Sequence, residues 1–426
     1  MSDIRSCTIP VTINGKSRCL HRDLIFKRDQ HPTAIKAQIK EVYLLNANSV
    51  TNGIFESREN NLDFLRLLLA LSVIYSHSFP LGGGPSANEP LNWFTHGQST
   101  IGTMAVDSFF ILSGFLVTNS FLRSKSVFSY FKKRIARIYP AFIVCMCLCV
   151  LAVSLLGEAK LAGNGLAGKL SNLAFHLAIL HEPIYLHSFS YNFSHKVDAS
   201  VWTICYEFYC YIAVAVLGII GVLGSRKFIL GLLIFSVVGM VAFSIAFSVA
   251  PPHSFLGHLF ATHAYLAERI DLRDQLIPMY LSGVAFYLFR DVIPHKIQLA
   301  LPAALLLLVS AFVPHLWFAT FSIAGAYLLF WVGFHPKLHL QRLTSTGDYS
   351  YGIYLYAFPI QQIILAKHGH AMAPFTLFLL AVPITALCGV LSWHLVEKRF
   401  LSKGRRKGKD APILPTTAVY QSGSAK

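Results

Sequence analysis

Apolar runs recur through most of the chain, and each is close to the roughly 20 residues that a helix needs to cross a hydrocarbon core of about 30 Å. Charged residues make up only 13% of the 426 positions, against about 25% in soluble proteins. The sequence therefore predicts an all-α polytopic membrane protein with about ten transmembrane helices. The ten candidate spans are residues 62–79, 101–121, 138–157, 205–224, 228–249, 276–290, 297–314, 316–334, 349–367 and 374–396.

The segments outside these spans suggest how the rest of the chain is organised. Residues 171–182 and 255–266 are apolar, contain histidines and are short for a span, so we expect re-entrant or interfacial helices there. Residues 1–58 are polar and basic and predict a weakly structured cytoplasmic extension, while residues 401–426 predict a basic cytoplasmic tail. Between them, residues 59–400 form the predicted integral membrane domain. The eight cysteines lack metal-ligand or paired-disulfide spacing, so we predict a packing role and no metal site.

The formal net charge of +16 could indicate a nucleic-acid partner, but its distribution favours another explanation. Basic residues accumulate in the cytoplasmic loops of membrane proteins. If both termini are cytoplasmic, the loops after every second span should be the basic ones. Those loops contain Arg123, Lys125, Lys132, Lys133, Arg134, Arg137, Arg226, Lys227, Arg290, Lys296, Lys337, Arg342 and the run 398–409. The pattern predicts ten spans with both termini inside, and no nucleic-acid partner.

The first span carries two ionisable residues, although each charged side chain in a span costs at least about 2.5 kcal/mol to insert. Arg66 and His77 are close to three helical turns apart and share one face, with Arg66 toward the cytoplasm and His77 toward the exterior. Asp63 lies three residues before Arg66 and is expected to pair with it. Two plainer interpretations stay open: Arg66 as an interfacial anchor, and His77 as a histidine at the water boundary.

The stretch VDSFFILSGF (residues 106–115) places Asp107 in the outer part of the second span. A carboxylate there needs a partner, and His77 is expected at a similar depth. A contact between Asp107 and His77 would fix the imidazole tautomer and raise its basicity. In the same stretch, Ser113 and Gly114 are predicted to be helix-packing residues.

The stretch ASVWTICYEFYCYI (residues 199–212) places Glu207 near the outer end of the fourth span, among aromatic residues. We expect this carboxylate at the level of His77, where it would add a third polar group on the outer side. The aromatic residues Trp202 and Tyr206 fit either an interfacial belt or a surface that stacks on the C–H face of a sugar.

The basic stretch KKRIARIYPA (residues 132–141) places Arg134 and Arg137 one turn apart at the cytoplasmic start of the third span. The guanidinium group offers a bidentate fork that suits phosphate oxygens. The same residues also fit ordinary positive-inside charge, and the sequence leaves both interpretations open.

Taken in order, these motifs make the chain resemble the membrane-bound acyltransferase-3 family, whose members O-acetylate carbohydrates on bacterial surfaces. The resemblance extends over about residues 60 to 400. Each motif alone is weak, and the order of all six carries the likeness. The matching elements are Arg66 with His77, the block Val106 to Phe115, the set Arg134, Arg137 and Pro140, the set Trp202, Thr203 and Glu207, and the stretches 350–360 and 393–400, the last with Glu397.

The resemblance implies transfer of an acetyl or related acyl group from acetyl-CoA to a sugar hydroxyl. Acetyl-CoA would be a substrate rather than a permanently bound cofactor, and the acceptor a glycan or lipid-linked oligosaccharide at the bacterial inner membrane, among its lipids. His77 would be the general base. The other implied site residues are Asp107 and Glu207 in the catalytic group, Arg66, Arg134 and Arg137 at the donor, and Trp202 and Tyr206 at the acceptor.

Two departures and two rival hypotheses accompany the resemblance. Many relatives have a histidine before the late Phe-Pro pair, where this chain has Ala357, so His77 carries more of the expected chemistry. Larger relatives append an extracytoplasmic domain, whereas a membrane module alone is expected here. A transporter or flippase could use the same buried charges as a relay, and an inactive relative could serve as a scaffold. An enzyme would have to bring the acetyl group across the membrane, by direct reach of the donor or through a covalent acyl-enzyme.

Overall fold

The computed structural model describes residues 10–13, 16–19, 60–249 and 275–401, in two units, residues 1–52 and 53–426. In the first unit, β1 (Pro10–Ile13) and β2 (Lys16–Cys19) pair antiparallel, with Pro10 opposite Cys19. The predicted interfacial segment 255–266, most of the predicted extension and the tail beyond residue 401 lie outside the described residues.

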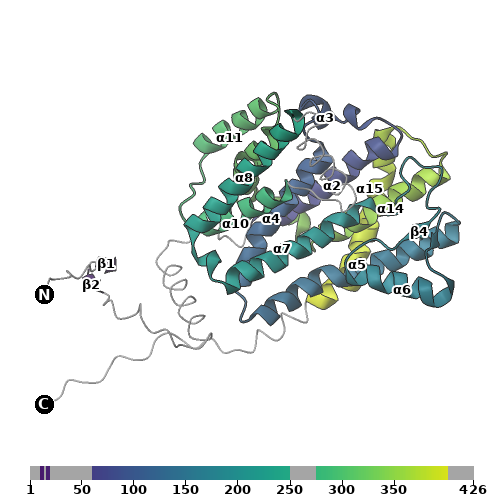
Figure 1. Ribbon diagram of the computed structural model, residues 1–426, viewed down its shortest axis with the longest axis horizontal. Helices are drawn as coiled ribbons and strands as arrows, with labels where there is room; N and C mark the ends of the chain where they lie inside the picture. The colour runs from purple at the N-terminus through teal and green to yellow at the C-terminus, as the bar shows by residue number, and fades with distance from the viewer. Residues whose placement is uncertain (1–9, 14–15, 20–59, 250–274, 402–426) are drawn as a thin grey trace, which may run out of the picture. The chain divides into compact units, whose positions relative to one another are not determined.

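The second unit is a bundle of helices that contains the candidate site (Figure 1). Its strands are limited, in the described part, to the two-residue pair β3 (Lys160–Leu161) and β4 (Tyr185–Leu186). The longer helices are α2 (Leu62–Leu81), α4 (Ile101–Leu122), α5 (Val127–Leu156), α6 (Gly165–Ala178), α7 (Trp202–Ile219), α8 (Arg226–Val249), α10 (Leu276–Phe289), α11 (Ile297–Ser310), α13 (Ala326–Gly333), α14 (Ser350–Lys367) and α15 (Pro374–Ser392). Short elements are α3 (Pro90–Phe94), α12 (Trp317–Thr320), η2 (Ser86–Asn88), η3 (Ala199–Val201), η4 (Val222–Gly224), η5 (Phe321–Gly325), η6 (Leu340–Thr344) and η7 (Trp393–Glu397).

Each of the ten predicted spans coincides with a helix or with consecutive helical segments. Six helices in the described part are long and apolar enough to cross a membrane, and three more are apolar but shorter. The chain is therefore an all-α, multi-pass membrane protein, while the count of ten and the side of each terminus stay predictions. Helix α6 has only 14 residues, about 21 Å of rise, so its predicted interfacial position also stays a prediction.

The third span differs most from its prediction, because α5 begins at Val127 rather than at residue 138. The side chain of Ser126 caps the helix by accepting a hydrogen bond from the backbone N–H of Ser129. The helix ends at Gly157, whose φ of 72° suits a left-handed residue without a side chain. Four of the basic residues expected in a loop thus lie on the early turns of this helix, which fixes their directions: Lys132, Lys133, Arg134 and Arg137.

The bundle packs α2 against α4, α14 and α15 at its centre, whereas α8 and α11 lie at one side of it (Figure 1). Helices α10 and α14 are buried along nearly their whole lengths. Helix α11 instead exposes most of its leucines, including Leu301 and Leu305. Exposed apolar side chains of this kind are expected to face lipid, because water would penalise them.

Two glycines allow α4 and α10 to approach closely. A Cβ at Gly114 would overlap the carbonyl oxygen of Tyr280, and a Cβ at Gly283 would overlap that of Ile111. The predicted packing role of Gly114 is therefore confirmed. The hydroxyl of Ser113 instead points to another helix, where it donates a hydrogen bond to Glu207.

The Gly283→Ala substitution should destabilise the protein, because the added methyl group must push apart two buried backbones. Overpacking of this kind typically costs about 1–3 kcal/mol, so the thermal midpoint of the detergent-solubilised protein should fall. Gly239→Ala in α8 is the matched control, since an added Cβ there meets no atom within 4 Å. A midpoint that falls equally in both variants would contradict the close approach of α4 and α10.

Candidate active site

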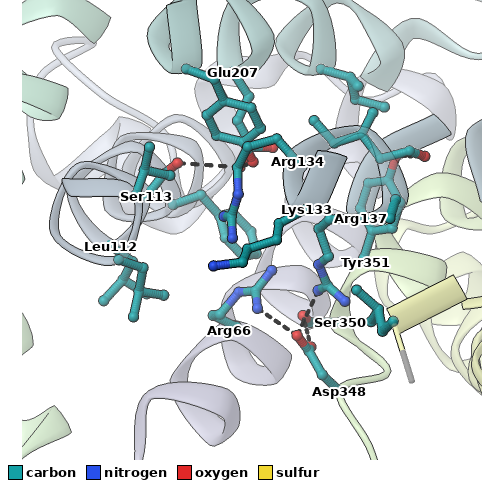
Figure 2. Close-up of a pocket in the computed structure, with 18 of the residues that line it drawn as sticks. Arg66, Leu112, Ser113, Lys133, Arg134, Arg137, Glu207, Asp348, Ser350 and Tyr351 are labelled. Atoms are coloured by element: carbon teal, nitrogen blue, oxygen red, sulfur yellow. Dashed lines mark hydrogen bonds and ion pairs between the residues drawn. The ribbon is translucent and has the colours of Figure 1, made fainter. Parts of the chain in front are cut away.

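A cavity of about 1340 Å3 opens among α2, α4, α5, α7, α14 and the segment that runs from η7 to residue 401. Its wall is rich in charge, and basic side chains outnumber acidic ones. The basic residues are Arg66, Lys132, Lys133, Arg134, Arg137 and Lys398, and the acidic ones are Asp63, Glu207 and Asp348. Figure 2 shows the three arginines and Lys133 directing their nitrogen atoms toward the middle of this space. The three arginines predicted to bind the donor therefore share one cavity.

Asp348 holds two of these arginines together. Its Oδ2 atom lies 2.5 Å from Nη1 of Arg66 and 2.5 Å from Nη2 of Arg137 (Figure 2). Arg137 also reaches Glu397, the last residue of η7, at 3.4 Å. Burial alone would raise the pKa of the Asp348 carboxyl, but the guanidinium groups of Arg137 and Arg66 outweigh it and hold that pKa well below its usual range. The carboxylate is thus charged throughout the physiological pH range.

Asp348 is a site residue that the sequence motifs do not single out. The sequence predicts that Arg66 pairs with Asp63, one turn away on the same helix, and this prediction is wrong. The structure pairs Arg66 with Asp348, because the loop before α14 lies beside the start of α2 and presents its carboxylate to the guanidinium. A usable signal existed: Asp348 comes two residues before the motif that begins at Ser350.

Arg134 differs from the other two arginines, since no ion pair joins it to a carboxylate in the described part of the chain. Its Nη2 atom donates to the hydroxyl of Ser120 at 3.2 Å, and its guanidinium lies 5.6 Å from the ring centre of Tyr211. Its buried Nε–H has no hydrogen-bond partner. Arg134 therefore retains donor capacity toward the cavity.

Glu207 lies in the same cavity and not at the level of His77, so its predicted depth is wrong. Its Oε1 atom accepts hydrogen bonds from Ser113 at 3.2 Å and from Tyr211 at 2.6 Å. Helix α7 begins already at Trp202, deep in the bundle, where the hydroxyl of the next residue lies 2.7 Å from that of Tyr354 in α14. Glu207 is one turn further along, among the arginines.

His77 and Asp107 do not line this cavity. The imidazole of His77 makes an edge contact with Phe358 of α14, at 5.4 Å between ring centres, and its buried Nδ1 has no hydrogen-bond partner. Asp107 is fully buried, and neither carboxylate oxygen has a partner. Such unsatisfied buried groups are rare in proteins and call for an explanation.

The hydrogen bond expected between His77 and Asp107 is therefore not present. The antiparallel packing of α2 and α4 explains the offset, because it places Gly102 beside Ser76. Asp107 then lies about 7.5 Å of helical rise further along α4, toward the arginines. Its neighbour Val106 lines the cavity. Asp107 thus lies on α4 between the level of His77 and that of the arginines, where the cavity wall begins.

The two residues predicted to bind the acceptor pack on each other at the start of α7. The rings of Trp202 and Tyr206 have centres 5.8 Å apart in an edge-on contact. Neither lines the cavity, although Thr203 and Ile204 of the same helix do. Within the described ranges, histidine, cysteine and carboxylate side chains form no group of three that could hold a metal. The chemistry that the cavity offers is the binding of an anion by guanidinium and ammonium groups.

A helical membrane unit around a large basic cavity defines a membrane protein that can bind an anionic substrate. Comparison with known proteins identifies the class. A family model described as an acyltransferase domain, that of acyltransferase family 3, matches residues 59–394. The chain belongs to this family and is an acyltransferase.

Two relatives agree with that assignment. The chain is 28% identical over 365 residues to an O-acetyl transferase of Shigella phage Sf6, which covers 82% of this chain and 98% of the relative. It is 34% identical over 122 residues to nodulation protein 10 of Rhizobium leguminosarum bv. viciae, covering 26% of this chain and 30% of the relative. No solved structure matches significantly.

Proposed function

We propose that the protein transfers an acetyl group from acetyl-CoA to a hydroxyl of a cell-surface or secreted carbohydrate, at the bacterial inner membrane. Membership of the acyltransferase family and the name of the phage relative support acyl transfer and the acetyl group. The acceptor would be a glycan or a lipid-linked oligosaccharide. The observation that carries the proposal is the basic cavity, because the acyl-CoA donor is a large, elongated polyanion.

The cavity suits such a donor in size and in charge. Its volume of about 1340 Å3 exceeds the roughly 300–1000 Å3 of ordinary small-molecule sites. Lys132, Lys133 and Lys398 line it at the starts and ends of helices that are predicted to face the cytoplasm. We place the phosphates of CoA against these lysines and Arg134, and its thioester toward Thr203 and Tyr354 in the interior of the bundle.

In the proposed reaction, His77 takes the proton from the acceptor hydroxyl as the hydroxyl oxygen attacks the thioester carbonyl. The bond between carbonyl carbon and sulfur then breaks, and the CoA thiolate leaves and takes the proton from the imidazolium, which restores the neutral base. Asp107 lies on α4 between the levels of His77 and of the arginines, so we propose that the charge of its carboxylate, without a direct hydrogen bond, stabilises the imidazolium once the proton has moved. General base catalysis of this kind typically contributes about 10²–10⁴ in rate.

Inside-out membrane vesicles test the proposal. Acetyl-CoA labelled in its acetyl group is added outside, and de-esterified surface polysaccharide from the encoding strain is enclosed within. Acetyl label should appear on the polysaccharide and be released by mild base. Movement of sugar across the membrane without acetyl-CoA, and without labelled product, would favour the transporter hypothesis instead.

Arg134→Ala should raise the apparent KM for acetyl-CoA about tenfold and leave the KM for the glycan unchanged, because a charge-assisted contact to phosphate is worth about one factor of ten. Initial rates at varied concentrations of each substrate measure the two constants. Arg134→Lys keeps the charge but loses the bidentate fork, so its KM for acetyl-CoA should lie between those of the wild type and Arg134→Ala. Arg123→Ala, at an exposed position at the end of α4, is the matched control. A rise in the KM for the glycan alone would refute a contact between Arg134 and the donor phosphates.

A further inference from the structure

The loop from His187 to Asp198, which precedes α7, presents two large aromatic side chains to the surroundings. Tyr191 is 80% exposed and Phe193 is 63% exposed, while Asn192 between them is buried. Exposure of such rings carries a cost, because each would gain from burial. The arrangement therefore calls for an occupant or a surface that covers them.

This loop is held rigidly against the end of α14. The Asn192 amide donates to the carbonyl oxygen and to Oε1 of Gln362, at 3.1 and 3.0 Å. The Gln362 amide in turn donates to the backbone oxygens of Ser194 and Lys196, at 2.7 and 2.6 Å. His370, which follows α14, donates from Nδ1 to Oδ1 of Asn192 at 2.7 Å. The two aromatic side chains thus project from a fixed backbone.

Backbone strain concentrates at the same place. His187 and Phe189 in the loop and His370 beside it have φ values of 55°, 42° and 67°. Residues other than glycine seldom adopt this left-handed region, and such strain tends to persist at functional sites. The loop is therefore held in a defined shape at a cost in free energy.

The two rings lie over the ends of the helices that carry His77 and its contact Phe358. The ring of Tyr191 packs on His370 after α14, with 5.4 Å between ring centres. The ring of Phe193 occupies the space that a Cβ of Gly83, after α2, would fill. Gln361, next to the residue that holds the loop, donates to the hydroxyl of Ser78, the neighbour of His77, at 2.8 Å.

The composition of the loop favours a carbohydrate over lipid as the occupant. The rings alternate with polar residues in the stretch SYNFSHK (residues 190–196), and His195 and Lys196 are exposed beside them. The lipid-facing surface of α11, in contrast, is formed by leucines in succession. Sugars present C–H faces that stack on aromatic rings, and hydroxyl groups that need hydrogen-bonding partners close by.

We infer that Tyr191 and Phe193 form an acceptor platform, which binds the carbohydrate chain and presents its hydroxyl to His77. This inference rests on the proposed function, of which it specifies the acceptor side. It assigns the acceptor to the loop 187–198 in addition to the start of α7. Arg134 and the lysines that we propose to bind the donor phosphates line the separate cavity, so the platform is expected to affect the acceptor and not the donor.

Kinetics of the full-length protein in membranes test the platform. The probes are labelled acetyl-CoA and the de-esterified surface polysaccharide of the encoding strain. The double variant Tyr191→Ala/Phe193→Ala should raise the KM for polysaccharide about tenfold and change the KM for acetyl-CoA by less than about twofold. Tyr191→Trp keeps a stacking face and should retain most of the affinity. Phe175→Ala is the matched control, since this ring in α6 is 60% exposed.

Direct binding gives a readout that does not depend on transfer. The purified protein should bind fluorescent polysaccharide at least about tenfold more tightly than the double variant. A wild type that binds in this way but transfers no acetyl group would overturn the proposed function and support the platform. Equal binding by both forms would overturn the platform, as would an equal rise in KM in Phe175→Ala. If the double variant lost membrane-inserted protein while its KM for polysaccharide stayed unchanged, the rings would belong to the lipid headgroup region. That result would also overturn the platform.

Discussion

Replacing His77 with alanine should reduce acetyl transfer at least about 10³-fold, which is within the range that a general base contributes. Within the described residues, the late position at which the family resemblance implies a second histidine is Ala357, a fully buried residue of α14, so we expect His77 to carry the proton transfer. The loss should appear in kcat, since the imidazole acts on the proton of the bound acceptor rather than on its affinity. Labelled acetyl-CoA and polysaccharide at saturating concentrations measure it.

The matched control is His339→Ala, because His339 is exposed and lies outside the cavity. Protein abundance and the thermal midpoint should stay near wild type in both variants. Asp107→Asn should also lower kcat, and the double variant with His77→Ala should be little worse than His77→Ala alone, since residues that act as a unit are not additive. Transfer that persists in His77→Ala would remove the imidazole from the mechanism.

The candidate site residues are predicted from ionisable side chains in or beside the apolar spans and from the order of the family motifs, and both signals are local in sequence. Arg66, Arg134 and Arg137 were expected together, and they do line one cavity. Their partner could not be predicted by the same means, because Asp348 lies 282 residues from Arg66 in sequence. The short-range rule favoured Asp63, but a carboxylate from another element had the better geometry.

The level of a site residue along the bundle is harder to predict from sequence than which residues belong to the site. The start of α7 was placed at residue 205, whereas the helix begins at Trp202, after the turn Ala199–Val201. Hydropathy does not show at what depth a helix begins inside a bundle. The sequence therefore predicts Glu207 at the outer end of the fourth span. Its hydrogen bonds to Ser113 and Tyr211 place it among the arginines instead. The helices themselves were predictable, because apolar length alone fixes them.

Asp348→Asn should lower transfer by about 100-fold and also lower the thermal midpoint, because it leaves the half-buried guanidinium group of Arg66 without a carboxylate and that of Arg137 with Glu397 alone. Breaking a buried ion pair by removing one partner typically costs about 3–5 kcal/mol. We expect a raised KM for acetyl-CoA, since Arg66 and Arg137 would no longer be held toward the cavity. Initial rates at varied acetyl-CoA, together with melting curves in detergent, measure both effects.

A second variant separates folding from function. In Asp348→Asn/Arg66→Gln the number of uncompensated charges falls, so the midpoint should recover while the KM for acetyl-CoA stays high. If both the midpoint and the KM for acetyl-CoA returned to wild-type values, Asp348 would have only a structural role. That result would contradict the expectation that Asp348 holds the arginines toward the donor.

The pH dependence of the midpoint supplies a further check on Asp348. Because the pKa of Asp348 is held below its unfolded value, its stabilisation is present above the unfolded pKa of about 3.9 and disappears as pH falls through the folded pKa. The difference in midpoint between wild type and Asp348→Asn should therefore stay constant from about pH 5 to 8. A difference that shrinks across that interval would mean that the carboxylate is not held by the two arginines.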